Sequence, residues 1–182
     1  MTMQSELTYA IVPAGPGDAA ELALVHVQAW RETYPGVLPA AYLARMSVAA
    51  HARRWRWRLL HVGEVTLAAE GEAGLVGYCS GEASRAGVPG EAEITTLYLL
   101  KTAQGSGLGR ALLTATARAL AARGATSLVI WVLADNLRAR AFYERLGGRR
   151  AEARREPIAG GSVAAVAYRW DDLPGWLSAS AG

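Results

Sequence analysis

Residues 97–110 read Leu-Tyr-Leu-Leu-Lys-Thr-Ala-Gln-Gly-Ser-Gly-Leu-Gly-Arg, and a short apolar run at 111–113 follows directly. The stretch 93–100 predicts a strand, and the residues after 109 predict a helix. Glycines at 105, 107 and 109 allow the backbone to come close to a ligand. Free N–H groups and the positive end of the helix dipole at this turn favour a phosphate or pyrophosphate. A strand-to-helix turn without a ligand has the same pattern, so these residues alone leave the ligand open.

Two other phosphate-binding loops can be tested against this stretch. A P-loop needs Gly-Lys-Ser or Gly-Lys-Thr after four intervening residues, and the chain contains no such run. The dinucleotide fingerprint G-x-G-x-x-G needs a third glycine where Arg110 or Leu112 stands. It also belongs near the first strand of a parallel sheet, whereas several expected strands precede this turn. Both interpretations fail.

The rest of the chain predicts helices and strands on both sides of the glycine turn. Before it we expect a strand at 7–12, a helix opened by a capping box of Asp18 and Glu21, a helical region at 40–60, and strands at 65–70 and 75–82. After it we expect a helix to about 123, a strand at 127–133, a helix at 136–146 and a hairpin of 150–156 and 163–170 across 159–161. The sequence therefore predicts an α/β (α+β) fold, one domain over residues 1–182, with a mixed sheet of about seven strands and about four flanking helices.

Composition limits the class of protein. The 182 residues suit one domain, and 52% hydrophobic with 19% charged residues is an ordinary globular balance. The net charge of +3, from 19 basic and 16 acidic residues, fits a small anionic ligand better than a nucleic-acid backbone. A solvated surface with slightly more arginine than glutamate explains the same charge.

Cysteine and histidine usage bears on location and metals. Cys79 is the only cysteine, so no internal disulfide can form and the reducing cytoplasm is the expected location. The longest apolar stretch, 111–122, contains Arg118 and is shorter than the ~20 residues needed to span a bilayer. The short apolar stretch and the modest net charge lead us to expect no membrane partner and no nucleic-acid partner. We also expect no metal, because the three histidines lack metal-ligand spacing: His26, His51 and His61.

Two motifs resemble those of a known family. The pattern Gln104-x-x-Gly107-x-Gly109 after a Leu-Tyr-Leu strand resembles the coenzyme A-binding motif of the GNAT superfamily of N-acetyltransferases. Residues 131–147 resemble that family's fifth strand and following helix, with Asn, Ala, Tyr and Gly at its usual spacing. The expected order of elements is also the family's order. The chain departs from the pattern at 100–103, where relatives often carry proline, and at Gly148, where an aromatic residue often follows; these differences concern loop rigidity and packing.

The resemblance implies acetyl-CoA as cosubstrate and assigns residues to it. Backbone N–H groups of the glycine turn would hold the pyrophosphate, and the preceding strand would pair with the pantetheine arm, with the Leu99 N–H facing the thioester oxygen. Asn136 would hydrogen-bond the arm, and Tyr143 would protonate the leaving thiolate. The implied coenzyme-binding residues are Leu97, Tyr98, Leu99, Gln104, Gly105, Ser106, Gly107, Leu108, Gly109, Arg110, Asn136, Ala139 and Tyr143.

The two implied catalytic residues, Tyr143 and Glu93, can be examined by helix and strand periodicity. Tyr143 lies seven residues after Asn136, so both can face one side of a helix, although Tyr143 could also be a core residue. Alternation along the strand predicts that Glu93 shares a face with Leu97 and Leu99. By resemblance, relatives use a glutamate here as general base, often through water. Glu91 or solvent is the alternative base.

Aromatic residues predict where the acceptor binds. Trp30 and Tyr34 lie one helical turn apart before the Pro- and Gly-containing stretch 35–39, and this helix–loop–helix resembles the acceptor wall of the family. Trp170 on the final strand could line the same cavity, as could Tyr168, while buried packing explains each of them too. Residues 53–58 alternate arginine and tryptophan, but on a helix they form a half-buried amphipathic surface rather than a nucleic-acid site.

These assignments favour an enzyme that transfers the acetyl group of acetyl-CoA to a primary amine of a small molecule by direct attack. Acetylation of a protein N-terminus or lysine is an alternative within the same class. A non-catalytic acyl-CoA-binding module is the alternative of a different class, but it has no need for Tyr143 and Glu93. The sequence leaves open the identity of the acceptor, the length of the acyl chain and the oligomeric state, a homodimer included.

Overall fold

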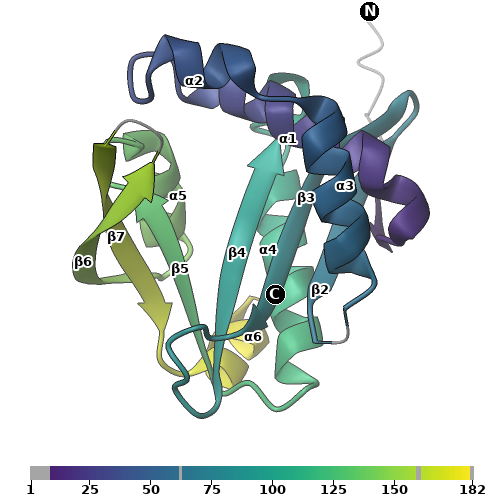
Figure 1. Cartoon of the computed structure of the whole chain (residues 1–182). Helices are drawn as coiled ribbons and strands as arrows, with labels where there is room; N and C mark the ends of the chain where they lie inside the picture. The colour runs from purple at the N-terminus through teal and green to yellow at the C-terminus, as the bar shows by residue number, and fades with distance from the viewer. Residues whose placement is uncertain (1–8, 62, 159–160, 181–182) are drawn as a thin grey trace, which may run out of the picture.

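The computed structural model describes residues 9–61, 63–158 and 161–180. Positions 7 and 8 of the first expected strand and 159 and 160 of the expected hairpin turn lie outside them. Within this part, seven strands form one sheet in the order β1-β2-β3-β4-β5-β7-β6. Figure 1 shows α1 and α3 on one face of the sheet and α4 on the other. The predicted mixed sheet of about seven strands is confirmed.

The bounds of the elements agree closely with the expected ones. The strands are β1 (Ala10–Pro13), β2 (Val65–Gly71), β3 (Gly74–Ala83), β4 (Glu91–Leu99), β5 (Ser127–Leu133), β6 (Arg149–Ile158) and β7 (Gly161–Trp170). The α-helices are α1 (Ala19–Thr33), α2 (Ala40–Arg45), α3 (Val48–Leu59), α4 (Leu108–Ala121), α5 (Leu137–Arg145) and α6 (Leu173–Ala179), with short 3-10 turns at Pro16–Asp18 and Lys101–Ala103. No helix in this part of the chain is long and apolar enough to cross a membrane.

Two helices depart from expectation. The helical region 40–60 divides into α2 and α3, because the Ser47 hydroxyl accepts a hydrogen bond from the Ala50 N–H (3.3 Å) and starts a new helix. Helix α6 was not expected; Asp172 begins it by accepting from the Gly175 N–H (3.0 Å). The structure thus has six α-helices in its described residues instead of about four.

The expected capping box at the start of α1 is wrong. The Asp18 carboxylate accepts from the Gly15 N–H (2.8 Å) instead of capping α1. The Glu21 carboxylate accepts from the Leu75 N–H (3.1 Å) on β3, so it fastens the helix to the sheet. A local contact before the helix thus engages Asp18, and a long-range contact engages Glu21.

The sheet opens between its two halves. Strands β4 and β5 are its parallel pair, and they pair only from Glu91 opposite Ser127 to Ile94 opposite Ile130. Beyond these positions both strands continue, and they diverge in Figure 1. The C-terminal half of β4 therefore keeps β3 as a neighbour on one edge and has no strand along the other. Unpaired backbone groups along such an edge are available to a ligand.

A β-bulge lies where β4 begins to leave β5. Gly81 pairs with Ile94 and Ser80 with Thr96, so Thr95 is an extra residue in β4. The extra residue reverses which side chains of β4 face which side of the sheet. Leu97 accordingly packs in the same core cluster as Ile94. The expectation that Glu93 shares a face with Leu97 and Leu99 is therefore wrong. Glu93 faces the other side of the sheet.

The core lies on both faces of the sheet. The larger cluster packs α4, α5 and α6 against β2–β5 and β7, and α4 contributes Leu112 and Leu113, both 0% exposed. A second cluster packs α1 and α3 against Ala68 and Tyr78. In α3, Trp55 is 2% exposed and Trp57 is 63% exposed, which confirms the half-buried amphipathic helix.

Candidate active site

The glycine turn leads from the open edge of β4 to the N-terminus of α4. Gly105 and Gly107 have φ of 82° and 84°, a conformation that other residues rarely adopt. A Cβ on either would meet nothing within 4 Å, so the space above the turn is open. The first N–H groups of the 14-residue helix α4 point out of its end without intrahelical partners. The turn can therefore accept an anion.

Side chains of the turn fix it to the strand. The Gln104 amide donates to the Leu99 carbonyl oxygen (3.0 Å), and the Ser106 hydroxyl donates to the Ala103 carbonyl oxygen (2.8 Å). A Cβ on Gly109 would lie 3.5 Å from Phe142 and 3.6 Å from Leu99, which is ordinary packing. Gln104 and Ser106 thus shape the loop, and Gly109 sits between α4 and its neighbours.

The direction of the β4 backbone determines which N–H groups face the opening. The Leu100 N–H donates to the Val76 carbonyl oxygen on β3 (2.8 Å). Successive N–H groups of a strand point to opposite edges. The Leu99 N–H therefore points away from β3, toward the edge where β5 has diverged.

Tyr143 lies at this opening, on the same side of the sheet as α4. It is 5% exposed, and its ring packs 5.9 Å from that of Tyr168. Burial raises the pKa of Tyr143, and Cys79 and Tyr34 add to the rise. Cys79 pairs with Leu97 of β4, so the phenol lies beside the strand that the coenzyme is expected to follow. The side chain stays protonated at neutral pH.

Asn136 and two tyrosines from the other side meet near the same place. The Asn136 side chain caps α5 by accepting from the Ala139 N–H (3.1 Å). The Tyr34 and Tyr98 hydroxyls lie 3.2 Å apart. Burial raises the pKa of Tyr34, and the Tyr98 and Asn136 side chains beside its hydroxyl offset part of that rise. The structure therefore brings Tyr34, Asn136 and Tyr143 into one neighbourhood. It also places the Tyr98 hydroxyl there, although only the backbone of Tyr98 was expected to take part.

The aromatic residues of the expected acceptor wall separate into two groups. The rings of Trp30 and Tyr34 are 5.1 Å apart, and Trp30 also lies 6.1 Å from Tyr98. Trp170 is not beside them: it is 4% exposed, and its indole N–H donates to the Leu146 carbonyl oxygen (3.0 Å). Alternation on β7 turns Trp170 toward the helices α5 and α6. The expectation that Trp170 joins Trp30 and Tyr34 in one wall is wrong.

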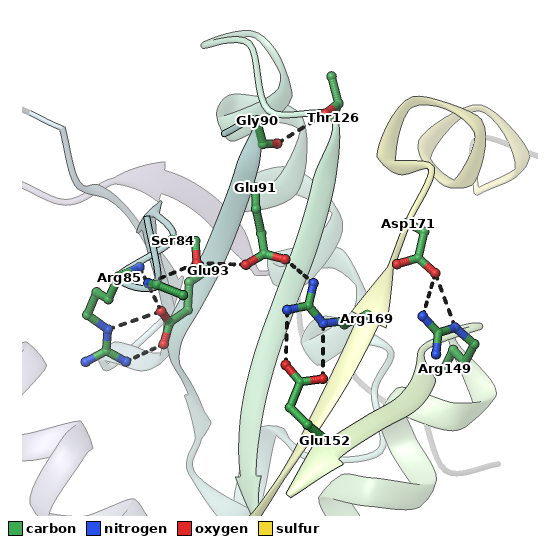
Figure 2. A network of polar contacts seen from close by, with 11 residues as sticks. Ser84, Arg85, Gly90, Glu91, Glu93, Thr126, Arg149, Glu152, Arg169 and Asp171 are labelled. Carbon is green, nitrogen blue, oxygen red and sulfur yellow. Dashed lines mark hydrogen bonds and ion pairs between the residues drawn. The ribbon is translucent and has the colours of Figure 1, made fainter. Parts of the chain in front are cut away.

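The two candidate bases project from the other face of the sheet into a cavity of about 260 Å³. The Glu93 carboxylate is paired with Arg85, and the Glu91 carboxylate with Arg169 (Figure 2). Both glutamates are buried, at 3% and 4% exposed. Arg85 and Arg169 were missed in the sequence; the alternation of β7 could have indicated Arg169, whereas nothing local indicated Arg85.

Among the described residues, no cluster of histidine, cysteine, aspartate and glutamate could hold a metal ion. The chemistry available is that of a protonated phenol, buried carboxylates and an open strand edge beside an anion-binding turn. A mixed sheet that opens along its parallel pair at such a turn defines the N-acetyltransferase class of fold.

Comparisons with known proteins agree with this class. Residues 27–148 match the model of the acetyltransferase (GNAT) family, and the chain belongs to that family. It is 31% identical over 157 residues to the uncharacterized N-acetyltransferase YuaI of Bacillus subtilis (strain 168), covering 86% of this chain and 89% of that one.

Solved structures share the fold. A GCN5-related N-acetyltransferase from Rhodopseudomonas palustris superposes with a TM-score of 0.72 and 25% identity, over 93% of this chain and 97% of that one. PaiA N-acetyltransferase from Thermoplasma acidophilum, in complex with coenzyme A, gives a TM-score of 0.66 with 18% identity, over 88% and 98%. The resemblance seen in the sequence is confirmed, and the protein is an acetyltransferase of this family.

Proposed function

We propose that the protein transfers the acetyl group of acetyl-CoA to a primary amine of a small-molecule acceptor, and that residues 1–182 act as a single domain. The observation that carries this proposal is the open edge of β4, which connects the glycine turn at one end with the Tyr143 phenol. A thioester lying along that edge would have its phosphates at the helix end and its sulfur near the phenol. The PaiA relative contains coenzyme A, which supports acetyl-CoA as the cosubstrate.

The chain offers groups for each part of the coenzyme. The N–H groups from Gln104 to Arg110 would hold the pyrophosphate, and the open edge from Leu97 to Leu99 would pair with the amides of the pantetheine arm. The Asn136 oxygen caps α5, so its amide N–H₂, which lies beside the Tyr34 hydroxyl, is the group that would donate to the arm. This side chain also anchors the start of the helix that carries Tyr143, so it fixes the phenol relative to the arm.

In the reaction, the acceptor nitrogen forms a bond to the thioester carbonyl carbon, and the carbon–sulfur bond then breaks. The Leu99 N–H, directed into the opening, would donate to the oxygen as it becomes negative. The Tyr143 phenol would donate to the departing sulfur. Because burial raises the pKa of this phenol, it serves chiefly as a hydrogen-bond donor to the thiolate. The final proton on sulfur then comes from the acetylated nitrogen or from solvent.

The acceptor must lose a proton before it can attack. Glu93 lies one residue before Ile94, the last position at which β4 pairs with β5, so its carboxylate stands at the base of the opening. We assign it as the base, acting through water, because it faces the side of the sheet opposite the Tyr143 phenol. Trp30 and Tyr34 would close the acceptor side, which favours a small molecule over a peptide.

A screen of free thiol release from acetyl-CoA tests this proposal. The acceptors would be amino acids, polyamines, aminoglycosides and short peptides. We expect release to depend on one class of small amines. Release with peptides alone would replace the small-molecule acceptor by a protein, and binding of acetyl-CoA without release for any acceptor would indicate a binding module.

A further inference from the structure

Two buried carboxylates open into the cavity on the face of the sheet opposite α4. The side chains of Glu93 and Glu91 are 4% and 1% exposed. A buried carboxylate is costly unless a positive charge accompanies it, and each of these two has an arginine partner. The partners differ in how firmly they are held.

Glu91 is fixed from several sides. Its carboxylate accepts from the Ser84 hydroxyl (2.7 Å) and is paired with Arg169. Arg169 is itself paired with Glu152 (3.1 Å) and is 23% exposed, as Figure 2 shows in the chain of contacts across the strands. Removing Arg169 would break two ion pairs at once. Glu91 is therefore a structural carboxylate.

Glu93 is held by one residue. Its carboxylate accepts from the Arg85 backbone N–H (3.2 Å) and the Arg85 Nε–H (3.2 Å), and it pairs with the end of the same guanidinium. The Arg85 side chain is 60% exposed and lies in the loop 84–90 between β3 and β4. The guanidinium itself loses little when it moves into solvent, because it is already largely exposed. The buried carboxylate, by contrast, needs a replacement cation.

The charges around the cavity favour such a replacement. Three arginines and three glutamates line it, so the lining is neutral while Arg85 is in place. If the Arg85 side chain swings out to solvent, the lining carries one negative charge. A positively charged ligand then restores the balance, and an anion does not. The residues counted are Arg85, Arg154, Arg169, Glu91, Glu93 and Glu152.

We propose that Arg85 is a removable cover of Glu93, and that its guanidinium occupies the place taken by the ammonium group of a small cationic acceptor. This inference rests on the proposed function. One ion pair is exchanged for another, so the buried carboxylate is never left without a cation. As the ammonium moves from the carboxylate toward the thioester, a water takes its place and carries a proton from the nitrogen to Glu93, which leaves a neutral amine with a free electron pair. Glu93 passes the proton to solvent, and the Arg85 side chain returns.

The binding of two small probes of opposite charge tests whether Arg85 covers Glu93. Butylammonium and butanoate have the same chain length and opposite charge, and calorimetry would measure both on the wild-type protein, on Arg85→Ala and on Arg85→Lys, each with a melting curve to verify folding. We expect Arg85→Ala to bind butylammonium about 3- to 10-fold more tightly than wild type, because the competing cation is gone. Arg85→Lys, which keeps the charge, should bind it about as wild type does. Butanoate should gain nothing from Arg85→Ala.

Nuclear magnetic resonance can follow the displacement directly. The Arg85 Nε–H signal, identified by its absence in Arg85→Lys, should move toward the position of a solvated guanidinium when wild type is saturated with butylammonium. The tighter binding of butylammonium by Arg85→Ala should disappear in the double variant that also carries Glu93→Gln. Equal butylammonium affinity in wild type and Arg85→Ala, or an unmoved Arg85 signal at saturation, would overturn the cover while leaving acetyl-CoA binding intact. If the wild-type protein does not bind acetyl-CoA, the proposed function is refuted instead.

Discussion

At the scale of single residues, the Tyr143 hydroxyl and the Glu93 carboxylate differ in how the protein holds them. Burial keeps the phenol protonated, and no hydrogen bond from a described residue contributes to its raised pKa. The carboxylate is held by an exposed arginine. In the proposed reaction, the phenol is thus a permanently protonated hydrogen-bond donor, and the carboxylate is a base that must first be uncovered. Substitutions can separate these roles.

For Tyr143→Phe we expect kcat to fall by roughly 10²–10⁴-fold if the donor limits the rate, with little change in the dissociation constant for acetyl-CoA. The substitution keeps the ring and removes only the hydroxyl, so the melting temperature should change little. Steady-state kinetics with a good acceptor and calorimetry with acetyl-CoA measure the two effects. An unchanged kcat with weaker acetyl-CoA binding would make Tyr143 a residue that positions the coenzyme.

For Glu93→Gln we expect the largest loss of rate at neutral pH and partial recovery as the pH rises. The physical reason is that at higher pH more of the acceptor amine is already deprotonated and needs no base. The measurement is kcat/KM for wild type and variant across the pH range in which both remain folded. A loss of the same size at every pH would assign Glu93 to holding the loop 84–90 through Arg85.

At the scale of elements, the glycine turn and α4 form one unit with two different ends. Gly107 begins α4 with φ of 84°, and Gly124 follows its other end with φ of 98°. A Cβ at either position would meet nothing within 4 Å. The two sites therefore carry a similar backbone cost on substitution, but only Gly107 lies at the expected phosphate site.

We expect Gly107→Val to abolish the rise in melting temperature that acetyl-CoA produces, since a branched side chain blocks close approach of the phosphates. Gly124→Val is the matched control: it should lower the melting temperature of the free protein by a similar amount and keep the shift with acetyl-CoA. Thermal melts with and without acetyl-CoA measure both. If the two variants respond alike, the turn does not bind the coenzyme.

Most elements could be predicted from the sequence because their signals are local. Glycines, prolines and the helical repeat of α4 fixed the bounds within a few residues. The bulge at Thr95 could not be predicted, because it depends on the register with β3, and it moved Glu93 to the face opposite Leu97. Arg85 was missed for a similar reason: its partner is eight residues away across a folded loop.

At the scale of the whole molecule, the packing of the helices α1 and α3 on one face of the sheet buries a histidine. His26 of α1 lies against Tyr78 of β3, with its Nδ1 atom 2.6 Å from the Tyr78 hydroxyl. Burial, and after it the charge of His51, lowers the pKa of His26 to about 3. His26 is therefore neutral in the folded protein at neutral pH, and its protonation opposes folding.

The free energy of unfolding should consequently depend on pH through His26. Its folded pKa lies below the ordinary value of 6.5, so the stabilisation is complete above about pH 6.5 and is lost as the pH falls toward about 3. The slope from this group approaches about 1.4 kcal/mol per pH unit at most. Urea unfolding of wild type and His26→Asn at several pH values measures it. His61→Asn, at a histidine exposed to solvent, is the control for the substitution itself, and an unchanged slope in His26→Asn would contradict the assignment.

The transfer of an acetyl group from acetyl-CoA to a small amine can be tested most directly by counting both products. Wild-type protein would be incubated with acetyl-CoA carrying a deuterated acetyl group and with the best amine from the thiol-release screen, and mass spectrometry would quantify labelled amide and free coenzyme A. We predict equal amounts of the two, formed only when the amine is present and absent with Gly107→Val. Release of coenzyme A without labelled amide would contradict the account.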